Sequence, residues 1–179
     1  MAWTAPMTAV ANAAFTAAQF NTHVRDNLNE TAPAKATTGG RLLVTTGLNS
    51  IAERVISESS VLTNESTSTT TFTNLATTGP SVTATTGTLA LVAMTALMNS
   101  DTAGESGAIA YEVSGASSVS TTDTRALRLT SVNAGDIQGA TSLHLQSLTA
   151  GSNTFTLKYR AVTTGTVTFQ QRRLIVIAL

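Results

Sequence analysis

The feature that most constrains the fold is a succession of short runs, from residue 51 to the end, in which apolar and polar residues alternate. Glycines and repeated Thr-Gly pairs separate many of these runs. Alternation is the pattern of a half-buried β-strand, and strands at this spacing with short turns are typical of antiparallel β proteins. We therefore predict a mainly β protein, an antiparallel β-sandwich of jelly-roll type rather than one built from βαβ units.

Alternation is clear in four runs, 126–130, 143–147, 155–159 and 167–169. The full set of predicted strands comprises 51–57, 69–76, 81–85, 88–98, 107–114, 124–132, 141–148, 153–162 and 166–178. The last strand is apolar and has no polar tail. An exposed apolar strand would promote aggregation, so we expect this strand to lie centrally in a sheet or to be buried between subunits. The candidate subunit-interface residues are Leu174, Ile175, Val176, Ile177 and Leu179.

The N-terminal region has a different pattern. Thr16 and Gln19 match a capping box, and apolar residues recur from there at helical spacing, at 17, 20, 24 and 28. Pro33 makes continuation of a helix unfavourable. We predict an extended start, a helix over about 16–29 and a turn-rich linker over 34–50. The sandwich domain then occupies 51–179, and residues 1–33 form a separate N-terminal arm.

A single helix of this length is marginally stable alone, so its apolar stripe must pack on the body, on a neighbouring copy or on a docking partner. Aromatic residues and arginine commonly dominate interfaces, which makes this segment the candidate docking site. For the charges at 25 and 26 two interpretations remain open, a solvated helix end and a polar docking face. The candidate docking residues are Trp3, Phe15, Phe20, Asn21, Val24, Arg25, Asp26 and Leu28.

Charge and composition exclude several classes of function. Ten basic residues balance ten acidic ones, and charged residues make up only 11% of the chain. A nucleic-acid binder or a protein held on anionic membranes needs a basic surface, so neither class is expected. There is no cysteine, and about a fifth of the residues are threonine, which favours strands and keeps an uncharged surface wettable. Such a surface suits a protein packed densely beside copies of itself.

The sequence offers little material for catalysis or cofactors. His144 alternates with two leucines, and we expect it to face solvent or an interface. No Gly-x-Ser-x-Gly motif is present. Asp101, Asp123 and Asp136 fall in predicted turns, where aspartate caps the local backbone. Glu105 and Glu112 are best interpreted as two solvated carboxylates. We expect no enzyme activity, no metal and no cofactor.

Two segments carry a resemblance. The start Trp3-Thr-x-Pro6, followed by the run from Thr16 to Leu28, Thr-Ala-Ala-x-x-Asn-Thr-x-Val-Arg-Asp-Asn-Leu, is similar to the N-termini of tailed-bacteriophage virion proteins described as minor tail or head-decoration proteins. The C-terminal runs 149–160, 165–169 and 172–177 resemble the end of phage fibre and decoration domains. Those domains are commonly trimers of β-sandwiches, so the resemblance implies a homotrimer.

The resemblance implies a virion structural protein, assembled in the host cytoplasm, whose partners are copies of itself and the major capsid protein or another virion protein. The first expectation is a trimeric decoration protein on the outside of the head, which ties neighbouring capsid proteins together. The alternative is a tail-fibre or minor tail module that recognises a host-surface glycan on its loops. The sequence has no basic segment followed by an apolar core of the kind that begins a secretory signal.

Overall fold

The chain folds into two compact units, Met1–Val55 and Ile56–Leu179. The computed structural model describes residues 4–179. The predicted linker 34–50 is instead part of the N-terminal unit and contains a strand. The predicted strand 51–57 is divided at Val55, because its first part pairs within the N-terminal unit and its second part begins the sandwich.

The N-terminal unit contains one nearly continuous helix followed by a hairpin. The helix consists of α1 (Ala17–Phe20), a π-helical turn η1 (Asn21–Arg25) and α2 (Asp26–Leu28). It confirms the helix predicted over 16–29. Thr16 caps it through the predicted capping box, in which the Gln19 amide donates to the Thr16 hydroxyl over 3.2 Å. A short helix, α3 (Ala32–Lys35), precedes the antiparallel pair β1 (Leu42–Gly47) and β2 (Ser50–Arg54).

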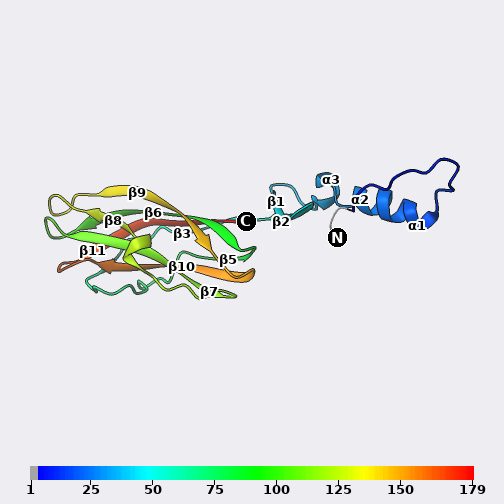
Figure 1. The fold of residues 1–179 in the computed structure, drawn as a ribbon. Helices are drawn as coiled ribbons and strands as arrows, with labels where there is room; N and C mark the ends of the chain where they lie inside the picture. Colours follow the sequence, from blue (N-terminus) through cyan, green and yellow to red (C-terminus); the bar gives the residue numbers. More distant parts are fainter. Residues whose placement is uncertain (1–3) are drawn as a thin grey trace. The chain divides into compact units, whose positions relative to one another are not determined.

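The second unit is a sandwich of two antiparallel sheets, drawn as two layers in Figure 1. One sheet has the order β3-β11-β6-β9, with β4 paired to part of β11, and the other has the order β5-β10-β7-β8. In chain order the strands are β3 (Ile56–Val61), β4 (Glu65–Thr67), β5 (Ser81–Thr86), β6 (Leu89–Ser100), β7 (Ser106–Gly115), β8 (Leu127–Thr130), β9 (Gln138–Ser147), β10 (Gly151–Ala161) and β11 (Val167–Ala178). A 3₁₀ turn, η2 (Asp123–Arg125), precedes β8.

The strand pairing is nested. β3 pairs with β11, β5 with β10, β6 with β9 and β7 with β8. The outermost pair thus joins the first and last strands of the sandwich, and each further pair lies inside the previous one along the chain. A long hairpin rolled into two sheets gives this pattern, which is that of a jelly roll. The predicted fold class is therefore confirmed.

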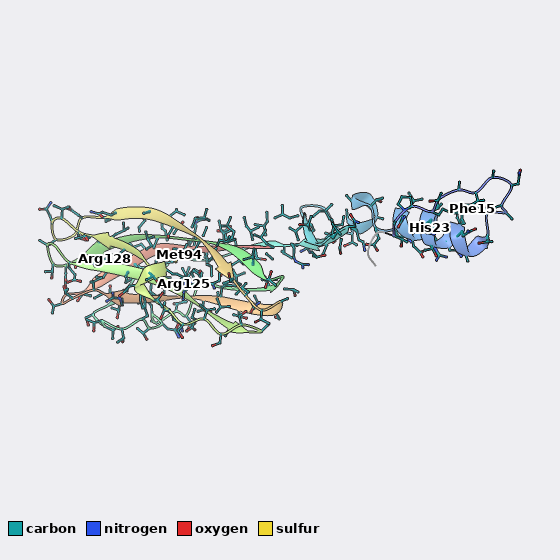
Figure 2. All side chains as sticks on the ribbon, viewed as in Figure 1. Phe15, His23, Met94, Arg125 and Arg128 are labelled. Carbon is teal, nitrogen blue, oxygen red and sulfur yellow. The ribbon has the colours of Figure 1, made fainter. Side chains whose placement is uncertain are left out.

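The core lies between the sheets and is built from the inward positions of the central strands. Met94, labelled in Figure 2, is fully buried on β6 and packs in one cluster with Phe155, Tyr159 and Phe169. The Tyr159 and Phe169 rings lie 5.0 Å apart, and the Tyr159 hydroxyl donates to the Gly79 carbonyl over 2.7 Å. Buried tyrosine hydroxyls need such a partner, so this bond also fixes the loop that leads into β5.

A bulge in β11 brings a charge into this core. The register shifts between Gln170 and Arg173, and Gln171 adopts a positive φ of 47°. The extra residue turns the Arg172 side chain inward, where it is 0% exposed and forms a 3.0 Å ion pair with Glu65. Because Glu65 also accepts the Thr77 amide over 3.0 Å, this pair holds the segment between β4 and β5. Residues 69–76, predicted as a strand, contribute only the single bridge Thr73 to Tyr159.

Candidate docking site

The N-terminal helix is held by an extended segment that runs beside it. Asn27 is its one buried residue, and its amide accepts the Thr4 N–H over 2.8 Å and donates to the Thr4 carbonyl over 3.0 Å. The His23 ring lies 3.1 Å from the Ala5 carbonyl oxygen. The Asn27 side-chain amide thus satisfies both the N–H and the C=O of Thr4, as the backbone of a neighbouring strand would. Sequence reasoning missed Asn27, because its partner Thr4 is 23 residues away and no local pattern indicates the contact.

This clasp leaves the apolar side chains of the helix facing outward. Phe20 is 49% exposed, and its ring meets that of Phe15 edge to face at 6.0 Å. Leu28 is also exposed, whereas Val24 is half-buried. The π-helical turn between Phe20 and Asp26 contains about one residue more per turn than an α-helix. The apolar residues before and after it are therefore rotated relative to each other, and the predicted stripe does not form one continuous buried face. We call Val10, Phe15, Phe20 and Leu28, the exposed large apolar residues of this segment, the docking surface.

A shallow groove adjoins the docking surface. It encloses about 250 Å³ between the extended segment and the start of the helix. Figure 2 shows Phe15 on this segment and His23 on the helix. The groove is lined mainly by small and apolar side chains, namely Met7, Thr8, Ala9, Val10, Ala13, Ala14, Phe15 and Gln19. An apolar side chain of a partner would fit such a hollow, since interface anchors fill pockets of this kind.

The predicted polar residues of the docking site are only partly free. Arg25 donates from Nε to Asp26 over 2.8 Å, so the two charges pair with each other on the surface. Asn21 is half-buried within the π-helical turn. Trp3 lies outside the described residues. The structure therefore brings Phe15 and Phe20 together, and it places the Arg25–Asp26 pair on the same helix.

The C-terminal strand is central in its sheet, which is one of the two placements expected for it. β11 lies between β3 and β6. Leu174 and Val176 are fully buried in the core of their own sandwich, so their side chains are not on its surface. Ile175, Ile177 and Leu179 point to the opposite side of the sheet and are half-buried. Of the five candidate interface residues, these three are placed where a neighbouring subunit could contact them.

His144 has the opposite orientation to the one expected. Its ring faces the inside of the sandwich, 6.2 Å from that of Tyr111, while Leu143 and Leu145 are exposed. The Ser142 hydroxyl lies 2.7 Å from the His144 Nε2. Burial, and then the nearby Arg125 that Figure 2 labels, lower the pKa of His144.

The acidic side chains hold loops. Glu105 is buried and accepts the Thr163 and Val162 amides over 2.9 and 3.1 Å, so the prediction that it is solvated is wrong. Glu112 pairs instead with Lys158 at 2.8 Å. Asp136 accepts the Asn133 amide of its own turn over 2.8 Å. Asp101 instead accepts the distant Thr166 amide over 2.8 Å, and Asp123 pairs with Arg160 at 2.7 Å. Within residues 4–179, no three acidic or histidine side chains gather as a metal site requires.

No family of known proteins matches the sequence, and no curated protein is similar to it. The helices of the described part of the chain are all too short or too polar to cross a membrane. In the described part of the chain, the residues placed to bind a partner are those of the docking surface and of the outer faces of the sandwich.

Proposed function

We propose that the protein is a structural component of a bacteriophage virion, a homotrimeric decoration protein on the outside of the head that docks through its N-terminal unit. The observation that carries the proposal is the clasp of Asn27 around the helix. This clasp makes a compact unit distinct from the sandwich and turns Phe15 and Phe20 outward. Exposed aromatic side chains on a fixed scaffold are suited to binding another protein.

Two further features support a mechanical role. Jelly rolls are the fold of many viral capsid domains, although they also form lectins and cupins, so the fold alone does not identify the function. The partly buried Glu65 and the buried Glu105 both hold loops in place. These contacts make the body rigid, which is what a protein that ties neighbouring capsid proteins together needs.

Gold-labelled antibody against the protein on intact particles tests the location. We expect label spread over the heads, and an absence of label from all particles would refute the virion role. The docking surface is tested by adding the purified protein to particles that lack it. Replacing Phe15 and Phe20 together by serine should abolish binding. Leu48→Ser is the matched control, because Leu48 is 91% exposed in the same unit and lies in the β1–β2 turn.

A tail-fibre or minor tail module that recognises host-surface glycan is the second candidate. It is favoured by an exposed hydroxyl pair on the outer face of the sheet β5-β10-β7-β8, where Thr83 and Thr154 lie 2.8 Å apart. Hydroxyls of this kind can bond to sugars. Gold label confined to tail tips, with binding of the protein to host cell-wall polysaccharide, would replace the head assignment with this one.

A further inference from the structure

The outer face of the sheet β3-β11-β6-β9 is apolar from one edge to the other. Ile56, Ile177, Leu91 and Leu145 lie opposite one another in a row that crosses all four strands. The next row contains Ile175, Ala93 and Leu143 and ends at the β3 edge with Glu58. On the other side of the first row, the Leu179 amide donates to the Leu89 carbonyl over 3.0 Å. We call this set the apolar face: Ile56, Leu89, Leu91, Ala93, Leu143, Leu145, Ile175, Ile177 and Leu179.

The opposite outer face of the sandwich is polar. On the sheet β5-β10-β7-β8 the exposed outer positions of β5 and β10 carry hydroxyls, such as the pair of Thr83 and Thr154, and Lys158 pairs with Glu112. That composition is what a sheet facing water normally shows. The two outer faces of the sandwich thus differ in polarity, one being apolar and the other polar. Leu143 and Leu145 are 61% and 62% exposed on β9, a ten-residue edge strand that natural proteins usually protect.

The size of the apolar face matches the centre of a subunit interface. Four strands at about 4.8 Å spacing and three rows about 6.7 Å apart give roughly 400 Å². A standard interface covers about 800 Å² per partner and consists of an apolar core within a polar rim. The rim is present here, because the next row contains Arg173 and the hydroxyl pair of Thr95 and Thr141 at 2.8 Å.

The charges at the rim indicate which partner fits. Glu58 and Arg173 form a 3.1 Å ion pair on this face, each about half exposed, so the rim carries one charge of each sign. The whole chain has a formal net charge of zero. A second copy therefore meets no net repulsion and can exchange ion-pair partners across the contact. Because the face is apolar at both edges, Ile56 on one side and Leu145 on the other, each copy can contact two neighbours, as a closed ring requires.

We propose that the apolar face is the contact between copies of this chain, with the β3 side of one copy against the β9 side of the next. This inference deepens the proposed homotrimer and rests on it, but it does not depend on a location in the virion. It extends the candidate interface from the C-terminal strand alone to all four strands. The residues predicted at the contact centre are Leu91, Leu145, Ile175 and Ile177.

Sedimentation of the full-length protein at micromolar concentration tests the proposal. The wild type should have three times the 18.4 kDa mass of one chain. Leu145→Asp should weaken association at least 100-fold and give the monomer mass. Leu62→Asp is the matched control, because Leu62 is 60% exposed on the same unit but lies in the loop after β3. It should remain trimeric. Far-UV circular dichroism and thermal melting establish that each variant is folded.

The outcomes separate the inference from the proposed function. A Leu145→Asp protein that associates as the wild type does would overturn the apolar face as the contact and leave the trimer standing. A wild-type dimer that Leu145→Asp dissociates would support the face and refute the trimer. A monomeric wild type would overturn self-association through this face, whatever the gold label shows. If Leu145→Asp fails to fold, Leu145→Thr, which suits an exposed strand position, should still weaken the trimer.

Discussion

Replacing Glu65 by alanine should destabilise the sandwich more than its position in a three-residue strand would indicate. The Arg172 guanidinium is 0% exposed, and among residues 4–179 its acidic partner is Glu65, at 3.0 Å. Without the carboxylate, Arg172 keeps hydrogen bonds to Thr63 and a position over the Tyr159 ring at 5.2 Å, but its charge stays buried and uncompensated.

The expected magnitude follows from the burial of the pair. Removing one partner of a buried ion pair costs about 3–5 kcal/mol, because the remaining charge loses both its counter-ion and its access to water. The Glu65 side chain is only 14% exposed, so solvent screens the pair little. The hydrogen bond that Glu65 accepts from the Thr77 amide at 3.0 Å is lost as well. For a domain of this size the loss corresponds to a fall in Tm of roughly 10–20 °C.

Urea unfolding followed by far-UV circular dichroism measures the change in the free energy of unfolding. It must be done at one protein concentration, because association adds to apparent stability. The double variant Glu65→Ala with Arg172→Met is the informative control. It removes both charges, so it should be more stable than Glu65→Ala alone by about 2 kcal/mol or more.

Two results would refute this reasoning. A loss below about 1 kcal/mol in Glu65→Ala would mean that Arg172 finds other compensation inside the core. A double variant as unstable as the sum of the two single variants would mean that the two charges are not coupled.

The remaining predictions concern acid and backbone strain. Burial raises the pKa of Glu105, but hydrogen bonds from Thr163, Ser106 and Val162 outweigh it and lower the pKa overall. The pKa values of Glu65 and Asp101 are also lowered. These three ionised carboxylates stabilise the folded state fully above the unfolded-state pKa, about 4, and this stabilisation is lost as pH falls through the lower folded-state pKa values. The Tm of the wild type should therefore drop steeply below about pH 4, and the Tm of Glu105→Gln should drop less steeply. A Tm that is flat down to pH 2 would contradict this. Gly115→Ala should cost more than about 2 kcal/mol, because φ is +105° and the new methyl would lie 2.4 Å from the Ser152 carbonyl oxygen. Gly104→Ala, with φ +76° and open space around it, should cost about 1 kcal/mol, and equal losses in the two variants would argue against the close contact.

Several elements could be predicted because their signals are local. The capping box of Thr16 and Gln19 and the spacing after it were sufficient to place the helix within a residue of each end. Alternation and turns were sufficient for an antiparallel jelly roll and for most of its strands. Both signals depend only on neighbours within a few residues, so no tertiary contact was needed to recognise them.

The hairpin β1–β2, the segment between β4 and β5 and the bulge at Gln171 were missed. The hairpin lies in a stretch with only a short apolar run, Leu42–Val44, and its strand pairing is decided by contacts within the N-terminal unit. The segment over 69–76 has strand-like residues, but strand β10, which is 84 residues away at this contact, holds it through the Thr73–Tyr159 bridge and the bond from Lys158 to the Asn74 side-chain oxygen at 2.8 Å. A bulge inverts the alternation after it, which the sequence pattern alone does not show.

The sequence by itself determined that the chain would form alternating strands with two chemically different sides, and that its first third would contain a capped helix. Only the tertiary structure decided which side faces the core. For β6 and β11 the apolar residues occupy both sides, and for β9 the leucines face outward while His144 faces inward. The physical reason is that a strand's orientation is fixed by the register and packing of the whole sheet, and a shift of one residue exchanges its two faces. The apolar face therefore became visible only when four strands were placed side by side.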